Sequence, residues 1–168
     1  VSTTAPGFIQ LETYNNAGSN TGQLKMNSAG LITGIGTSLG AWTSWTPTIG
    51  GGTWALGNGT LTGFAYCQIG KLVHFRGRIT WGTTSVFGAA GLTLSTPVAG
   101  SGNNHQSISG FCVDISASNA RYPVTANLIS SSMSLFNNAS PVAALISTVP
   151  FTWTSTDILD VCGWYEAA

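Results

Sequence analysis

The chain has 168 residues, of which only 6% are charged, and its five lysines and arginines balance its five acidic residues. An ordinary globular protein has about 25% charged residues, and a zero net charge provides no long-range attraction for nucleic acid or an anionic membrane. The longest aliphatic run, residues 142–146, is far shorter than the roughly 20 residues that span a bilayer, so we expect no membrane insertion. Low charge and six tryptophans favour an oligomer or a durable extracellular particle over a merely neutral monomer.

The first forty residues have too few large side chains to form a core of their own. Two strand-like runs, 8–14 and 23–26, flank a polar turn, and apolar residues spaced by small ones follow in 28–36. An isolated hairpin is marginal in water. We therefore predict an N-terminal arm or short shaft, residues 1–40, whose strands are completed by neighbouring chains or by the particle on which it docks. Its candidate contact residues are Phe8, Leu11, Leu24, Leu31 and Ile32.

Residues 41–168 contain frequent short strand-like runs and almost no helical periodicity. The runs are 60–69, 72–81, 92–95, 108–115, 125–129, 132–136 and 158–165. Turn-forming residues such as Gly, Asn and Ser separate them, and many of these tolerate positive φ. Short strands with turn signals at this spacing are typical of a sandwich or jelly roll. The sequence predicts one all-β domain, an antiparallel β-sandwich with jelly-roll character.

One predicted strand, Lys71 to Trp81, has two distinct faces. Successive side chains of a strand point to opposite faces of its sheet. The odd positions are mainly apolar and the even positions are mainly polar: Val73, Phe75, Ile79 and Trp81 against His74, Arg76, Arg78 and Thr80. Such a strand belongs to an antiparallel sheet with one packed face and one face near water or a partner.

The polar face of this strand carries His74, Arg76 and Arg78. One interpretation is a site for an anion or a sugar acid. The other, which we favour, is a structural face that meets a carboxylate such as Asp114, Asp157 or Asp160 across a sheet or a subunit interface. In the second interpretation these three cations are subunit or particle contacts.

Sequence motifs for catalysis, metals and cofactors are absent from the chain. It has no Gly-x-Ser-x-Gly and no phosphate-binding glycine loop. Asp157 and Asp160 fall on opposite faces of a strand, so they do not form the carboxylate pair of a glycosidase. A pair between one of them and a carboxylate elsewhere in the chain is the alternative. His105 has no second histidine at metal-ligand spacing. We expect neither an enzyme nor a bound metal or cofactor.

The three cysteines, Cys67, Cys112 and Cys162, have strand-like neighbours and no Cys-x-x-Cys spacing. Their odd number argues against a complete disulfide framework. We expect small apolar residues packed in strands, with one internal or intersubunit disulfide as the alternative.

The tryptophans divide by their sequence context. Trp81 and Trp164 follow strand alternation and are expected in the core. Trp42, Trp45 and Trp54 lie in loop-like sequence, where exposed indoles can anchor contacts outside the domain.

Three stretches in the first half of the predicted domain form a pattern: Trp-Thr-Ser-Trp-Thr-Pro-Thr at 42–48, Gly-Asn-Gly-Thr-Leu-Thr-Gly at 57–63 and Tyr-Cys-Gln-Ile-Gly-Lys-Leu-Val-His-Phe-Arg-Gly at 66–77. Together they resemble the β-rich terminal modules of bacteriophage tail and fibre proteins. The similarity covers about residues 42–81 well and the remainder only by strand rhythm. It implies a trimeric, jelly-roll-like, non-catalytic virion protein, and it supplies no binding residues.

The resemblance leads us to expect a bacteriophage structural protein on the surface of the virion, assembled in the host cytoplasm. A homotrimeric tail-fibre or receptor-binding tip that contacts the host surface is slightly favoured. A capsid decoration protein, docked on the capsid lattice through its arm, is the close alternative, and the small size of the chain suits it. A secreted carbohydrate-binding module is a further alternative. The expected partners are other copies of the chain, other virion proteins through the arm, and a host glycan.

Host recognition, if the chain performs it, is expected at loops and not on the cationic strand face, because loops carry variable residues on a fixed scaffold. The candidates are Trp54 beside a glycine run, His105 in a polar loop, and Arg121 with Tyr122. An arginine fork and a flat ring suit polar sugars, but they equally suit a neighbouring subunit.

Overall fold

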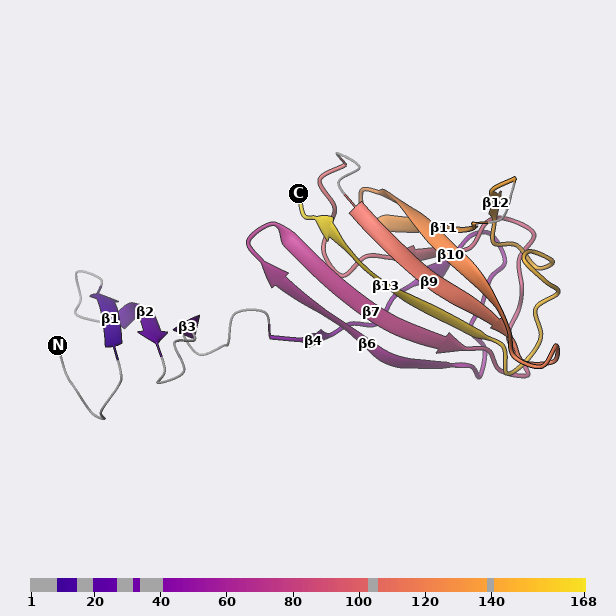
Figure 1. The fold of residues 1–168 in the computed structure, drawn as a ribbon, viewed down its shortest axis with the longest axis horizontal. Coiled ribbons are helices and arrows are strands. Elements are labelled where there is room, and N and C mark those ends of the chain that lie inside the picture. The colour runs from indigo at the N-terminus through magenta and orange to yellow at the C-terminus, as the bar shows by residue number, and fades with distance from the viewer. Residues whose placement is uncertain (1–8, 15–19, 27–31, 34–40, 103–105, 139–140) are drawn as a thin grey trace. The chain divides into compact units, whose positions relative to one another are not determined.

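The computed structural model describes residues 9–14, 20–26, 32–33, 41–102, 106–138 and 141–168, with side chains described in the ranges from residue 41 onward. The chain divides into two compact units, Val1–Ala41 and Trp42–Ala168. In both units the described residues form antiparallel strands joined by turns and loops, and none of them is helical (Figure 1). The predicted all-β class is therefore confirmed.

The smaller unit contains a three-stranded sheet in the order β1-β2-β3, with bounds Ile9–Tyr14, Asn20–Met26 and Ile32–Thr33. Leu11 lies opposite Leu24 in the β1–β2 register, and Ile32 lies opposite Met26. Phe8 and Leu31 lie outside the described residues. The proposed contacts of these side chains stay predictions, because the structure describes only the backbone of β1, β2 and β3.

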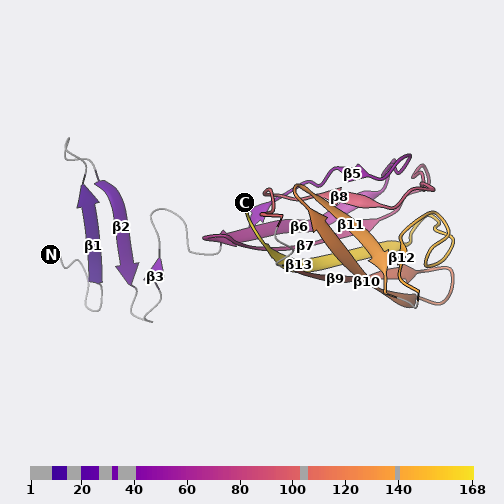
Figure 2. The ribbon, with the colours of Figure 1, turned by 90° about the horizontal axis from the view of Figure 1, so that it is seen from above.

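The larger unit is built on one antiparallel sheet in the order β4-β6-β7-β13-β9-β10-β11-β8-β5, with β12 paired to β11. The strands are β4 (Thr43–Ser44), β5 (Ile49–Gly50), β6 (Thr60–Ile69), β7 (Leu72–Thr80), β8 (Thr93–Ser95), β9 (Gln106–Asp114), β10 (Ala120–Ile129), β11 (Ser132–Asn137), β12 (Ala143–Ala144) and β13 (Ile158–Glu166). Figure 2 shows the sheet curled, with β5, β8 and β11 stacked over the part that contains β6, β7, β13 and β9. The result is an antiparallel β-sandwich with jelly-roll character.

The core lies between the two stacked parts of the curled sheet. The large apolar odd positions of the predicted two-faced strand, Val73, Phe75, Ile79 and Trp81, enter it as expected, whereas Lys71 is exposed. Leu72, His74, Arg76 and Arg78 point outward. The buried apolar side chains come from both parts of the sheet and include Val73, Phe75, Ile79, Trp81, Leu92, Leu94, Met133, Leu135, Leu159, Val161 and Tyr165.

Trp54 belongs to an aromatic cluster inside the core, so the prediction that it recognises a partner at the surface is wrong. Its side chain is 5% exposed, and its Nε1 donates a 2.7 Å hydrogen bond to the carbonyl oxygen of Ala90. Its ring centroid lies 5.4 Å from that of Trp81 and 6.1 Å from that of Trp153. Room for the indole exists because residue 88 is glycine: a Cβ there would lie 2.5 Å from Trp54 Cδ1. Backbone hydrogen bonds in both directions between Ala55 and Val86 tie the following residue to the neighbouring segment.

Trp164 is also placed differently from its prediction, because it is 39% exposed and not in the core. Leu159, Val161 and Tyr165 are the inward side chains of β13, which leaves Trp164 on the outer face opposite His74 of β7. The side chains of β13 alternate as expected, but Trp164 belongs to the outward set and not to the buried one. Trp81 occupies the core as predicted.

All three cysteines lie in strands and none is bonded to another. Only Cys112 is packed as expected, at a buried position of β9. Cys67 of β6 is partly exposed and Cys162 of β13 is exposed. The thiol pKa of Cys112 is raised, chiefly because burial disfavours the thiolate and secondarily because Asp157 is nearby.

Candidate functional site

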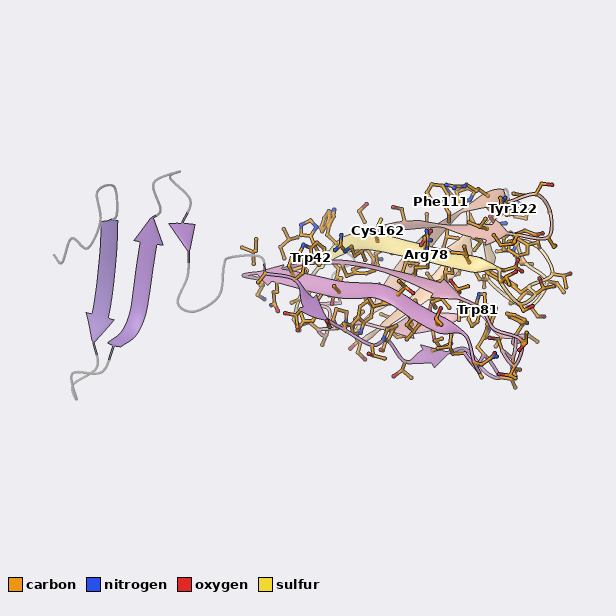
Figure 3. The ribbon with its side chains drawn as sticks, turned by 90° about the horizontal axis from the view of Figure 1, so that it is seen from below. Trp42, Arg78, Trp81, Phe111, Tyr122 and Cys162 are labelled. Atoms are coloured by element: carbon orange, nitrogen blue, oxygen red, sulfur yellow. The ribbon has the colours of Figure 1, made fainter. Side chains whose placement is uncertain are left out.

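A trough of about 650 Å³ crosses the outer face of the sheet. Strands β6, β7, β13, β9 and β10 contribute to it, and Asn138 adds to one end. Figure 3 views this face, with Arg78, Cys162 and Phe111 labelled on it. The residues that line it are Thr62, Gly63, Arg76, Gly77, Arg78, Ser109, Gly110, Phe111, Pro123, Val124, Thr125, Asn138, Asp160, Val161 and Cys162. We call this feature the strand-face trough.

The trough is hollow because short side chains lie between long ones. Arg76, Cys162 and Ser109 are successive partners across β7, β13 and β9, so a thiol and a hydroxyl follow a long arginine. The edge at β6 is interrupted by a register irregularity between Thr62 and Ala65, where Gly63 adopts a φ of 64°. A bulge of this kind bends the strand and removes a side chain from the row.

Arg78 and Asp160 form a bidentate ion pair inside the trough. Arg78 Nε donates to Asp160 Oδ1 at 2.7 Å, and a terminal guanidinium nitrogen donates to Oδ2 at 2.8 Å. The two residues are direct partners in the β7–β13 register. The hydrogen bond to Asp160, followed by its charge, raises the pKa of Arg78 above its usual value. The structural interpretation of the cationic face thus applies to Arg78, which meets a carboxylate across the sheet.

Arg76 has a different environment. Its guanidinium carbon lies 4.6 Å from the ring centroid of Trp42, which is an exposed cation–π contact. Among the residues that the structure describes, Arg78–Asp160 is the only ion pair, so Arg76 has no carboxylate partner there. His74 is exposed at the next outward position of β7. The trough therefore carries a net positive charge from Arg76.

Phe111 is the aromatic side chain of the trough, and sequence reasoning missed it. It is 48% exposed on β9, directly opposite Asp160 in β13 and Pro123 in β10. In the run Phe111-Cys112-Val113 every residue is apolar, so the sequence hides which one faces outward. The signal that was available is the alternation of Ile108, Gly110 and Cys112, which are the inward positions of this strand.

The buried carboxylates of the larger unit have structural partners. Asp157 Oδ1 accepts from the backbone N–H of Ile115 at 3.0 Å, and its Oδ2 accepts from the backbone N–H and hydroxyl of Thr154 at 2.7 and 3.0 Å. Asp114 Oδ1 accepts from the Ser116 hydroxyl and from the backbone N–H of Ala117. Both groups hold loops at the ends of strands. Within the described ranges no three His, Cys, Asp or Glu residues are placed to hold a metal ion.

The other predicted site residues are dispersed. Arg121 is exposed on β10, whereas the ring of Tyr122 is half-buried, with its centroid 5.1 Å from that of Phe151. Trp45 packs on the core and keeps part of its surface exposed, and Trp42 is exposed. His105 lies outside the described residues. The structure thus brings Trp42 and Arg76 together, and it separates both from Arg121.

The described residues contain no helix that is long and apolar enough to span a membrane. Comparison of the chain with protein-family models, with curated proteins and with solved structures finds no match.

Proposed function

We propose that this protein is a non-catalytic structural component of a bacteriophage virion, exposed on the particle surface and assembled in the host cytoplasm. The observation that carries the proposal is the stretch 42–81, which resembles phage tail and fibre modules. Within this stretch β4, β6 and β7 are neighbours in the sheet, whereas β5 pairs with β8 at the other edge. The backbone N–H of Trp45 donates to the Phe64 carbonyl oxygen at 3.1 Å, and the Trp45 ring packs edge-on against Phe64 and Phe75. These residues form the framework of the domain, so the resemblance indicates the type of module and not its binding partner.

The proposed lack of catalysis is supported by the use of the described acidic residues. Asp114 and Asp157 are buried and hold loops, and Asp160 is paired with Arg78. A hydrolytic centre would need a carboxylate or histidine aligned with a second reacting group. The strand-face trough exposes hydroxyls, an aromatic ring and arginines, which can bind a ligand.

Within the virion we favour a homotrimeric tail-fibre tip that contacts the host surface. An exposed apolar patch at one end of the β6–β7 hairpin supports assembly: Ile69 and Leu72 flank the turn as register partners, and Trp164 lies opposite His74, the next outward residue. Trp42, over Arg76, extends the row. We call these four residues the hairpin-end patch. Clustered exposed apolar side chains are typical of interaction sites, and a neighbouring subunit would cover them.

Sedimentation equilibrium tests the trimer directly. The wild-type chain is expected to sediment as a trimer, and the double substitution Trp42→Ser and Leu72→Ser is expected to weaken that association. Ile129→Ser is the matched control, because Ile129 is an exposed apolar residue of β10 outside the patch. A wild-type chain that stays monomeric at high concentration would contradict the trimer.

A capsid decoration protein is the second candidate. The smaller unit supports it, because a unit with its own three-stranded sheet is a suitable docking element for a lattice. Quantitative mass spectrometry of purified particles separates the two roles: a few copies per virion indicate the tail, and hundreds indicate the capsid. Absence from particles, together with glycan binding by a monomer, would replace both with a secreted carbohydrate-binding module.

A further inference from the structure

We propose that the strand-face trough binds an acidic saccharide, with Phe111 stacking on a sugar ring and Arg76 pairing with the sugar carboxylate. The inference rests on the proposed contact with a host surface and names the chemistry of that contact. It places the binding site on the strand face and not at the loops favoured by the sequence.

The size and lining of the trough suit a short carbohydrate. Ligand sites generally have volumes of about 300–1,000 Å³, with apolar surface and a few polar groups that fix orientation, and this trough has about 650 Å³. Phe111 offers an exposed ring, while Thr62, Ser109 and Thr125 offer hydroxyls. A pyranose presents an apolar face to an aromatic ring and hydroxyls at its edge, so it matches both kinds of surface.

The positive charge of the trough favours a ligand that carries a carboxylate. Asp160 neutralises Arg78 through two hydrogen bonds, and the same bonds hold that guanidinium in place. No described carboxylate pairs with Arg76, whose guanidinium lies over the Trp42 ring instead. An incoming carboxylate can accept two parallel hydrogen bonds from such a fork. The ligand therefore carries a carboxylate at the Arg76 end.

The spacing of the two anchors fits more than one sugar ring. Arg76 lies across β13 from Ser109, and Phe111 is two residues farther along β9. Strand spacing and residue rise place the Cα atoms of Arg76 and Phe111 about 12 Å apart. A disaccharide or trisaccharide spans this distance once the length of the arginine side chain is included.

A second copy of the chain is a poorer occupant on charge grounds. The chain has five acidic residues. Asp114 and Asp157 are buried in the larger unit, and Asp160 is already paired. Only Glu12 and Glu166 remain to complement Arg76 from another subunit, and Glu166 is itself half-buried. The carboxylate of a saccharide can reach Arg76 without rearrangement of an acidic side chain of a second copy.

Isothermal titration of the full chain with a galacturonic acid trisaccharide, and with the matched neutral galactose trisaccharide, tests the inference. The wild type is expected to prefer the acid. Arg76→Gln is expected to remove that preference, at least a tenfold effect, because a charge-assisted pair is lost. Phe111→Ala is expected to weaken both sugars about tenfold. Lys71→Gln is the control, since Lys71 is an exposed cation of the β6–β7 turn that does not line the trough.

Thiol labelling locates the bound sugar. Cys162 is exposed inside the trough, and Cys67 is partly exposed outside it. The acidic trisaccharide is expected to slow maleimide modification of Cys162 and to leave that of Cys67 unchanged, as read by peptide mass spectrometry. Equal protection of both thiols, or of neither, overturns the placement.

Two results would overturn the inference as a whole. One is a folded wild type that binds neither sugar at millimolar concentration. The other is loss of self-association in Arg76→Gln and Phe111→Ala without sugar binding, which makes the trough a subunit interface. Failure of the virion proposal is a separate observation: absence from purified particles refutes that proposal, while acid-selective binding by the isolated chain still supports the trough.

Discussion

Asp157 shows how a single buried polar residue is used in this protein. It is 0% exposed and accepts hydrogen bonds from two backbone N–H groups, of Ile115 and Thr154, in different segments. A carboxylate in this position connects the end of β9 to the segment that precedes β13. Because those donors are part-buried, they depend on this side chain for their partner.

Substitution Asp157→Ala is expected to lower the free energy of unfolding by about 2–5 kcal/mol, since it removes the acceptor of buried donors. Urea unfolding at neutral pH measures the change. The control is Asp160→Ala, which breaks an exposed ion pair and is expected to cost about 0–1 kcal/mol. Similar losses in the two variants would show that the buried hydrogen bonds of Asp157 contribute little.

Cys112 makes stability sensitive to alkaline pH. Its pKa is raised in the folded state by burial and by Asp157, whereas an unfolded thiol ionises near pH 8.5. Above about pH 8.5 the unfolded chain has lost a proton that the folded chain retains, so stability falls as pH rises, by up to about 1.4 kcal/mol per pH unit. Below that pH the contribution is fully present.

Urea unfolding between pH 7.5 and 9.5, under reducing conditions, checks this expectation. Cys112→Ala is expected to be less stable at pH 7.5, because it leaves a small cavity, and to lose less stability as pH rises. Parallel pH profiles for wild type and variant would exclude Cys112 as the source.

The shape of the trough depends on the close pairing of β9 with β13. A Cβ at Gly110 would overlap the backbone carbonyl oxygen of Asp160, so the two strands approach more closely than a side chain permits. Both strands are in the middle of the sheet order and supply Phe111, Asp160 and Cys162 to the trough. Gly110 is therefore a requirement of strand packing and not a flexible point.

Gly110→Ala is expected to destabilise the larger unit by at least about 3 kcal/mol, because backbone atoms must move apart. Gly70→Ala is the matched control: it lies in the β6–β7 turn at a φ of 60°, with no atom within 4 Å of a new Cβ. Its expected cost is about 1–2 kcal/mol of backbone strain. Thermal unfolding compares the two variants, and a smaller effect at Gly110 would contradict the packing argument.

The larger unit contains its own core. Every residue of its buried cluster lies between Trp54 and Ala167, and the sheet that surrounds the cluster begins at β4. The structural requirements for folding thus lie within Trp42–Ala168. The three strands of the smaller unit pair with one another.

A protein that consists of residues 42–168 is expected to fold cooperatively, with a thermal midpoint within a few degrees of that of the larger unit in the full chain. Circular dichroism in the near-ultraviolet range, which reports on the packed tryptophans, measures this. Loss of that signal on removal of residues 1–41 would show that the smaller unit is needed for folding.

Features that depend on neighbours along the chain could be predicted from the amino-acid sequence. Strand periodicity and turn residues were sufficient for the all-β class and for the alternation of Val73, Phe75 and Ile79 with His74, Arg76 and Arg78. These features follow from local geometry, since side chains alternate along any strand. The same alternation, without knowledge of the buried face, placed Trp164 on the wrong side of β13.

Contacts between residues far apart in the chain become visible only in the folded domain. Arg78 and Asp160 are 82 positions apart in the chain, yet they pair because β13 returns to lie between β7 and β9. The exposure of Phe111 and the burial of Trp54 follow in the same way from non-local contacts, with β13 and with Ala90 and Gly88. Strand order and the curl of the sheet depend on the packing of the whole core, and a single strand does not encode which face that core will bury.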